Sequence, residues 1–227
     1  FNSDFTVFTN PFFVAESKLN HTNDAWAVFG QVSIPLGERW TLTGGMRYTD
    51  DEKETTAINA PAPTPDVSVN GEQTSFDLSL MWDANESLNL YGRVANGFRA
   101  PSIQGRDVAF FGGTSVADAE TILSYEVGFK ANMAGNRVLI NGAMFHYTIE
   151  DMQLTAIGGA SNAVQLVNAA TGSGTGMDLD ASFGITDPVG VTAGCSVGVP
   201  ELRDDPLVVP ACGCGRGTPL EGPEGNG

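Results

Sequence analysis

The residues best suited to binding a ligand are arginines, because they stand in a strongly acidic chain. The sequence has 27 Asp and Glu against 11 Lys and Arg, a formal net charge of −16. Arg93, Arg99 and Arg106 come close together along this chain, and guanidinium groups attract and bind anions. Arg99 and Arg106 are therefore candidate contacts for an anionic solute. The alternative is that these arginines pair with carboxylates such as Asp107 or Glu126.

Two adjacent phenylalanines, Phe110 and Phe111, are further candidates for contacting a ligand. They fall in a long polar stretch that we expect to be a loop, so their rings are expected to be exposed. Aromatic side chains are common in sites that bind small molecules. Phe110 and Phe111 therefore join Arg99 and Arg106 as the predicted ligand-binding residues.

The remaining polar residues do not predict catalysis. The chain has two histidines and no His-Glu-x-x-His motif, so we predict neither an enzyme nor a bound metal or cofactor. His146 falls within an expected strand, where a lumen or girdle position is favoured over a ligand role. Asp178 and Asp180 share one strand face, and a solvated carboxylate pair is favoured over a calcium site.

Three cysteines constrain the fold only weakly. Cys212 and Cys214 lie in a Gly- and Pro-rich tail that we interpret as an extracellular loop, whereas Cys195 stands apart from them. An odd number cannot pair completely within the chain. A Cys212–Cys214 disulfide would close a small, strained ring, so this pair is a candidate disulfide only.

The elements that carry these residues are expected to be β-strands. Apolar and polar residues alternate with a period of two along most of the chain, as in strands with one apolar and one polar face. We count about eight such strands between residues 24 and 199, longer than those of soluble sheets. Clear examples are residues 26–34, 40–49, 74–82, 88–94, 125–130 and 177–183. A β-bulge is expected at Gly172, Ser173 and Gly174.

The lengths of the connections indicate a barrel in a membrane. Short turns are expected at residues 37–39, 83–87, 133–136 and 186–188, and long loops at residues 50–71, 99–121, 152–162 and from 200 onward. Short turns at one end and long loops at the other are typical of outer-membrane barrels. The alternative is a soluble β-sandwich.

The two faces of the expected strands favour the barrel. Four aromatic residues on the apolar face lie near strand ends, where such rings sit at the level of lipid headgroups. They are Trp26, Trp40, Tyr48 and Trp82. The polar face is rich in charges, which a water-filled or plugged lumen tolerates and a two-sheet core does not. Its charged residues are Arg47, Asp77, Arg93, Glu126, Lys130, Asp178 and Asp180.

Composition and the ends of the chain narrow the class further. The acidic balance argues against binding to nucleic acid, and no stretch predicts a transmembrane helix. No signal peptide begins the chain, which ends in Gly-rich residues rather than on a strand. We therefore expect an internal fragment. Because an open sheet in hydrocarbon would leave unpaired edges, the eight strands are expected to be an arc of a larger barrel.

Five segments resemble a known family, the TonB-dependent outer-membrane receptors. Residues 91–102 are similar to the family's Y-x-R-x-x-x-G-F-R-A-P-S segment. The other segments appear in the family's order and, with it, cover most of residues 24–199. They are residues 45–53 (G-x-R-Y-T-x-D-x-K), 125–130 (Y-E-x-G-x-K), 145–153 (F-x-Y-x-x-x-D-M-Q), and 167–169 followed by 176–180 (x-N-A, then G-x-E-x-E).

The resemblance implies an antiparallel transmembrane β-barrel of roughly 22 strands, with a plug, in the outer membrane of a Gram-negative bacterium. It implies TonB-dependent uptake of a scarce, bulky solute such as a ferric siderophore. Residues 1–227 would form part of the barrel domain, without the plug and the C-terminal strands. The implied partners are TonB (through the missing plug), outer-membrane lipid and a small-molecule iron complex. Residues 97–101 look like a structural element of the family's barrel, which favours the pairing interpretation of the arginines.

Two other classes of function stay open from the sequence. A small passive outer-membrane barrel with a structural or adhesive role needs neither a plug nor coupling to an energy source. A soluble secreted β-sandwich with a binding role needs no membrane.

Overall fold

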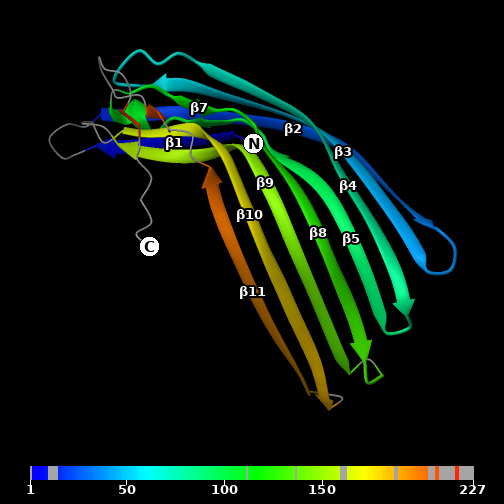
Figure 1. The fold of residues 1–227 in the computed structure, drawn as a ribbon. Helices are drawn as coiled ribbons and strands as arrows, with labels where there is room; N and C mark the ends of the chain where they lie inside the picture. Colours follow the sequence, from blue (N-terminus) through cyan, green and yellow to red (C-terminus); the bar gives the residue numbers. More distant parts are fainter. Residues whose placement is uncertain are drawn as a thin grey trace.

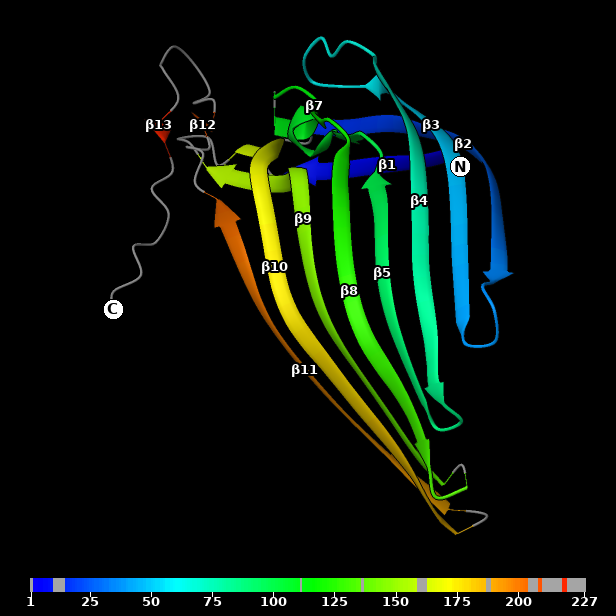
Figure 2. The same ribbon diagram turned by 45° about the vertical axis from the view of Figure 1, so that its right-hand side comes forward.

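The computed structural model describes residues 2–9, 15–110, 112–135, 137–158, 163–186, 189–203, 208–209 and 218–219. Most of these residues form a single curved layer of long antiparallel strands (Figures 1 and 2). The layer is a nine-stranded sheet in the order β1-β2-β3-β4-β5-β8-β9-β10-β11. Its strands are β1 (Asn2–Thr9), β2 (Ala15–Pro35), β3 (Trp40–Asn59), β4 (Val67–Asn85), β5 (Leu88–Arg99), β8 (Glu120–Met133), β9 (Val138–Gly158), β10 (Ala163–Thr186) and β11 (Val189–Arg203).

Three short elements interrupt the run of long strands. Strand β6 (Ser102–Gln104), the 3-10 helix η1 (Arg106–Phe110) and strand β7 (Ser115–Ala117) connect β5 to β8, and β6 pairs with β7. We call residues 100–119 the β5–β8 loop. Strands β12 (Val208–Val209) and β13 (Thr218–Pro219) form a separate small pair. Within the described residues, no helix reaches the length and hydropathy needed to cross a bilayer.

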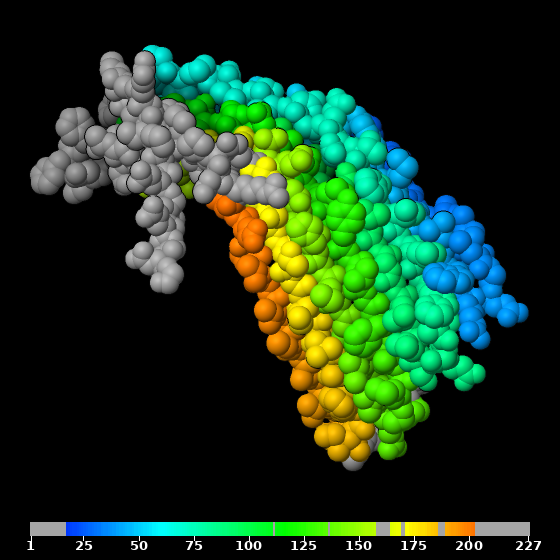
Figure 3. Space-filling view, in the orientation of Figure 1, coloured from blue at the N-terminus to red at the C-terminus, as the bar shows by residue number. Residues whose placement is uncertain are grey.

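The expected antiparallel sheet of about eight strands is confirmed. Strands β2 to β5 and β8 to β11 correspond to the eight expected between residues 24 and 199, and β1 adds a ninth before them. Figure 3 shows these strands side by side in sequence order, from β2 to β11. Because the nine strands belong to one continuous sheet, the two-sheet sandwich is wrong for the described residues.

Two of the expected long loops are wrong, because strands run through them. Strand β3 continues to Asn59 and β4 begins at Val67, and their pairing extends to Thr55 opposite Val67. Strand β9 likewise continues to Gly158. A polar stretch remains in a ladder when both of its faces meet water, because the backbone hydrogen bonds do not depend on an apolar face. The polar composition therefore marks where the apolar face of a strand ends rather than where the strand itself ends.

The bulge expected at Gly172 and Gly174 is also wrong. The pairing of β10 with β9 is regular there, with Gly174 opposite Tyr147 and Gly176 opposite Phe145. A Cβ at Gly174 or Gly176 would clash with the ring of its partner, so these glycines make room for aromatic side chains from the next strand. The register shifts are found between Lys18 and Leu19, Asp83 and Asn85, and Gly184 and Thr186.

Cross-strand pairing sorts the side chains onto an apolar outer face and a polar inner face. Residues directly opposite one another point to the same side of a sheet. One outer row contains Leu42, Leu80, Val127 and Met144, joined through successive pairs by way of Gly92. The charged residues expected to share a lumen face all lie on the inner face. They are Arg47, Asp77, Arg93, Glu126, Lys130, Asp178 and Asp180.

The outer face forms an apolar band bounded by aromatic rings. The band covers about nine residues on β3, from Trp40 to Tyr48, and a transmembrane β-strand needs ~9–11. Trp40 stacks on Trp82 with ring centroids 5.6 Å apart, near the short turns. The rings of Trp26 and Tyr48 are in contact at the other edge of the band, with centroids 5.4 Å apart. Between these pairs the apolar side chains are bare, with Met46 64% exposed, as a lipid-facing surface requires.

The two ends of the sheet differ. We call the end with the short turns the turn end, and the end that carries the β5–β8 loop the loop end. At the loop end, β2, β9 and β10 bend over toward the loop (Figures 1 and 2). The buried apolar side chains of the described residues gather there: Leu19, Val108, Ala109, Ala117 and Val164. The loop end is therefore where this single-layer sheet has a packed core.

Candidate functional site

The β5–β8 loop packs between strands that lie far apart in the sheet. Val108 of η1 is fully buried, and η1 contacts both β2 and β10. On the β2 side, Leu19 packs so closely on Gly105 that a Cβ there would clash with Leu19 Cδ1. On the β10 side the buried residue is Val164. The loop thus joins the bent ends of two hairpins instead of projecting into solvent.

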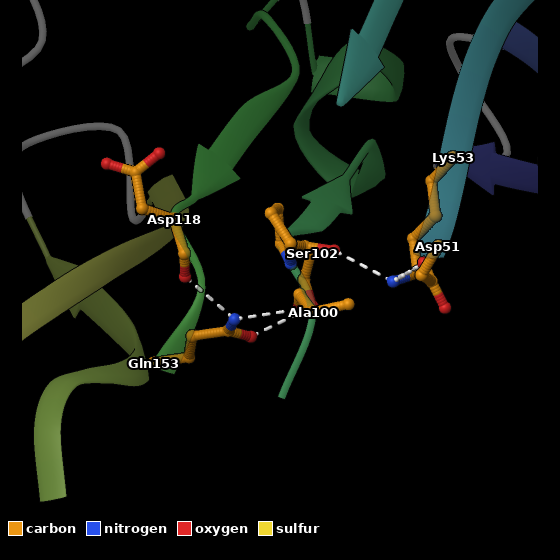
Figure 4. Close-up of polar contacts among 7 residues, drawn as sticks. Asp51, Lys53, Ala100, Ser102, Asp118 and Gln153 are labelled. Carbon is orange, nitrogen blue, oxygen red and sulfur yellow. Dashed lines mark hydrogen bonds and ion pairs between the residues drawn. The ribbon is translucent and has the colours of Figure 1, made fainter. Parts of the chain in front are cut away.

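Gln153, on β9, holds both ends of the loop (Figure 4). Its side-chain Nε2 donates to the carbonyl oxygens of Ala100 (2.9 Å) and Asp118 (2.8 Å). Its Oε1 accepts from the Ser102 hydroxyl at 2.8 Å, and its backbone N–H donates to Glu120 Oε2 at 2.7 Å. Gln153 is only 6% exposed. Its amide is therefore a buried polar group with all its main partners supplied by the loop.

Lys53, on β3, holds the start of the loop from the other side. Its Nζ donates to the carbonyl oxygen of Pro101 at 2.9 Å and forms an ion pair with Asp51 at 2.6 Å (Figure 4). The carboxylate of Asp51 neutralises the ammonium group and keeps it in place. Lys53 on β3 and Gln153 on β9 therefore both hold the loop through hydrogen bonds to its backbone carbonyls.

Asn168, on β10, closes the end of the loop. Its Oδ1 accepts from the backbone N–H of Asp118 at 2.7 Å, and its Nδ2 donates to the Asp118 carbonyl at 3.1 Å. The same Nδ2 donates to the carbonyl of Asp151 at 2.7 Å. Asp151 has a φ of 54°, a left-handed conformation that costs energy for a residue other than glycine. Asn168 thus ties the loop to a strained position in β9.

Side chains of the loop also cover an open edge of β10. Among the described residues, β11 pairs with β10 only from Thr171 onward, so the edge donors of the preceding described residues have no strand partner there. The Val164 N–H donates to Asp107 Oδ2 at 2.8 Å, and the Leu166 N–H donates to Ser115 Oγ at 2.9 Å. Unpaired strand edges are covered in this way in native proteins. The buried carboxylate of Asp107 is therefore a structural acceptor.

The anchors come from segments that the sequence placed on separate strands. Gln153, Lys53 and Asn168 each belong to one of the five recognised segments, and Ala100 and Ser102 belong to a fourth. None of these residues was predicted to act together with another. The sequence marks each anchor only as a polar residue at the end of an alternating strand. It does not show which of these strand ends lie close together in space.

Two of the predicted ligand residues, Arg106 and Phe110, are exposed on the loop. Arg106 lies over the ring of Phe110, 5.5 Å from its centroid, and Phe110 is 51% exposed. Arg99 is exposed at the end of β5, opposite Glu120 in the register. Phe111, Cys212 and Cys214 lie outside the described residues. The assignment of these residues to a solute, and the Cys212–Cys214 disulfide, stay predictions.

Arg93 is separated from the other two arginines. It forms an ion pair with Asp77 on the inner face, as the pairing interpretation expects, although with a different carboxylate from those considered. Arg93 and Arg99 are six residues apart on β5, or roughly 20 Å at the rise of a strand. The two do not form one basic cluster.

The other candidate residues have structural partners. His146 faces outward, and its Nδ1 lies 2.8 Å from Thr175 Oγ1, which corresponds to a girdle position. Asp180 accepts a hydrogen bond from Asn141 at 2.7 Å. Throughout the part of the chain that the structure describes, no three His, Cys, Asp or Glu side chains are grouped to hold a metal ion.

One motif with a catalytic association is present in the sequence, around Ser196. Residues 194–198 read Gly-Cys-Ser-Val-Gly, which has the form Gly-x-Ser-x-Gly of a hydrolase nucleophile elbow. That elbow requires a sharp turn from a strand into a helix. Ser196 instead lies within the regular pairing of β11 with β10, opposite Asp178. The motif is therefore a strand segment and not an elbow.

His21 gives the loop end a dependence on pH. It lies on β2, beyond Trp26 and outside the apolar band, and its Nδ1 is 2.7 Å from Oγ1 of the buried Thr55. Burial lowers the pKa of His21 below its usual 6.5, because desolvation disfavours the charged imidazolium. The unfolded state then takes up a proton at a higher pH than the folded state. The loop end of the folded protein therefore has its full stability above about pH 6.5. It loses part of that stability as the pH falls from there to the lower pKa of His21 in the folded state.

We expect hydrogen-exchange protection at the paired ends of β2 and β3 to be weaker at pH 5.5 than at pH 7.5, after correction for intrinsic rates. His21→Gln, which cannot titrate, is expected to remove this difference. Equal protection at the two pH values in the unmodified protein would contradict the role given to His21.

The geometry defines a class of protein. One continuous antiparallel layer has an apolar outer face with aromatic borders, a charged inner face, short turns at one end and a packed loop at the other. This is the wall of a transmembrane β-barrel.

Residues 1–199 match the family model described as TonB dependent receptor-like, beta-barrel. The chain belongs to this family, and the resemblance seen in the five segments is confirmed. No curated protein matches the chain.

Solved structures of similar fold are receptors and transporters. The ferric yersiniabactin uptake receptor FyuA from Yersinia pestis has a TM-score of 0.70 at 21% identity, over 90% of this chain and 30% of that one. The siderophore receptor PiuA from Acinetobacter baumannii has a TM-score of 0.65 at 16% identity, over 91% of this chain and 28% of that one. The copper transporter OprC has a TM-score of 0.60 at 16% identity, over 83% of this chain and 30% of that one. The chain thus spans about 30% of the length of these proteins, and neither they nor the matching family are enzymes.

Proposed function

We propose that this chain is part of the barrel of an outer-membrane receptor that takes up a scarce, bulky solute in a TonB-dependent manner. The observation that supports this proposal most strongly is that one sheet has an apolar band on its outer face and charged residues on its inner face, in a chain of the TonB-dependent receptor family. The loop end would face the outside of a Gram-negative cell and the turn end the periplasm.

The nine strands would be an arc of a larger closed barrel, with residues 1–227 forming part of the barrel domain. Support comes from the order of the sheet, which has β1 and β11 at its two ends. In hydrocarbon, each unpaired backbone group at such an edge costs several kcal/mol. The small passive barrel is less well supported, because a closed barrel of these strands alone would pair β1 with β11.

The solute we propose is an iron complex of the siderophore kind. One of the similar structures is named a ferric yersiniabactin uptake receptor and another a siderophore receptor, whereas a third is a copper transporter. The test is uptake of radioactive iron as ferric catecholate and ferric hydroxamate complexes by cells that contain or lack the complete receptor. Uptake that requires both the receptor and TonB supports the proposal. Receptor-dependent uptake that is unchanged without TonB would favour a passive barrel.

Arg106 and Phe110 would contact the solute from the exposed side of the β5–β8 loop. Replacing both by alanine is expected to weaken binding of the preferred complex about tenfold, the effect of losing one charge-assisted contact. The measurement is equilibrium binding to the purified receptor. Arg39→Ala, which removes an exposed arginine at the turn end, is the matched control and should bind normally. Equal affinity in all three proteins would exclude the proposed contact.

A further inference from the structure

The outer face has a hollow in the middle of its apolar band, at Gly92. The hollow measures about 740 Å³ and has Leu80, Val94, Val127 and Met144 among its lining residues. Gly92 forms its floor, because a Cβ there would meet nothing closer than the Glu126 carbonyl at 4.0 Å. The walls are therefore apolar side chains of neighbouring strands around a position without a side chain.

Polar groups stand at the end of this hollow that faces the loop end. Tyr125 lies opposite Val94 in the register, His146 lies opposite Tyr125, and Thr175 lies opposite His146. All three line the same hollow. They occupy one row of the outer face, directly beside the row that contains Gly92. A molecule lying in the hollow would thus have an apolar part over Gly92 and a polar part beside Tyr125 and His146.

The donors of this row are available to a ligand. The His146 Nδ1 is taken by Thr175 at 2.8 Å, which leaves Nε2. The Tyr125 side chain is 53% exposed, and the structure shows no hydrogen-bond partner for its Oη among the described residues. When Thr175 donates to Nδ1, the proton of the imidazole is on Nε2. Tyr125 and His146 then offer two donors at the border of the apolar band.

Two other polar residues of the outer face near this border, Tyr48 and Asn96, are already paired. The Tyr48 hydroxyl donates to Glu72 at 2.8 Å. Asn96 accepts from the Phe76 N–H at 2.6 Å and donates to the Thr74 carbonyl at 3.4 Å. The row of Tyr125 and His146 differs from them in having unfilled donors next to an apolar hollow.

We propose that this hollow is a binding site for one phosphate-bearing membrane lipid. An acyl chain would lie over Gly92 between Leu80 and Val127, and the phosphate would accept hydrogen bonds from Tyr125 Oη and His146 Nε2. The depth agrees with this assignment, because polar and aromatic residues at the edge of the apolar band lie at the headgroup level. The inference rests on the proposed membrane location of the chain.

The test is native mass spectrometry of the purified complete receptor with phosphatidylglycerol, and with diacylglycerol of the same acyl chains. Gly92→Leu fills the hollow and is expected to weaken binding of both lipids by about tenfold or more. Gly30→Leu is the matched control. Gly30 also lies on the outer face, where a Cβ would have no atom within 4 Å, and its variant should bind like the unmodified receptor.

The donors are tested by Tyr125→Phe combined with His146→Ala. This variant is expected to weaken phosphatidylglycerol binding about tenfold and to leave diacylglycerol binding unchanged. If the Gly92→Leu and Gly30→Leu receptors retain phosphatidylglycerol equally, the site is overturned. Membrane insertion is measured separately by fractionation. A receptor that does not enter the membrane contradicts the proposed function, whereas one that inserts without selective lipid binding contradicts this inference alone.

Discussion

Replacing Val32 by arginine is expected to destabilise the membrane-inserted barrel by about 2–4 kcal/mol, the cost of an arginine facing lipid near the bilayer midplane. Val32 lies on the outer face of β2, between Trp26 and the β2–β3 turn, and is 62% exposed. Because Val32 is exposed to this extent, an arginine in its place would meet hydrocarbon. The measurement is urea unfolding of the complete receptor in phospholipid vesicles.

The matched control is Ser33→Arg, one residue further along the same strand. Ser33 points to the inner face, where its hydroxyl lies 2.9 Å from that of Thr43. An arginine there would reach a polar lumen, so its stability should remain close to that of the unmodified protein. If the two variants are equally stable, the outer face of β2 does not contact lipid and the assignment of the faces is wrong.

Replacing Gln153 by alanine is expected to release the β5–β8 loop. The substitution leaves the carbonyls of Ala100 and Asp118 and the hydroxyl of Ser102 without the partner they share. Each buried polar group that loses its partner costs about 1–3 kcal/mol, and water entering the opened site would recover part of this. We expect the free energy of local opening of the loop to fall by ~3 kcal/mol.

Hydrogen exchange of the amides in residues 102–118 measures this opening. Exchange should accelerate in the loop of Gln153→Ala while the amides of the apolar band stay protected, because the strands there keep their own ladders. Gln31→Ala is the control, since Gln31 is exposed on the inner face of β2. Loop protection that is the same in Gln153→Ala as in the control would show that the hydrogen bonds of Gln153 do not hold the loop.

Most of the sheet could be predicted from the sequence because a strand in a membrane wall has a local pattern. Side chains alternate between lipid and lumen, so residues such as Leu42 and Thr43 reveal both the strand and its faces without knowledge of any partner. The aromatic borders are equally local, since Trp40 and Trp82 each stand where an apolar run ends. The five family segments added the order and the class of the barrel.

The extent of the strands was harder to predict, because the pattern disappears where both faces meet water. Residues 50–59 read as a loop, yet they continue β3 as far as Asn59. The bulge expected at the glycines of β10 was wrong because it, too, depends on neighbouring strands that the local sequence does not show. Gly174 and Gly176 suggest a bulge in isolation, and only the register shows that Tyr147 and Phe145 lie across them.

The sequence by itself determined the all-β class, the faces of the strands and the family, because each depends on spacing along the chain. Only the tertiary structure decided how the loop end is built. Lys53, Ser102 and Gln153 come from different strands or connections, and they meet because β3, β5 and β9 are brought to one end of a curved sheet. The physical reason is that hydrogen bonds such as these depend on distances in space, which the alternation of residues along a strand does not encode.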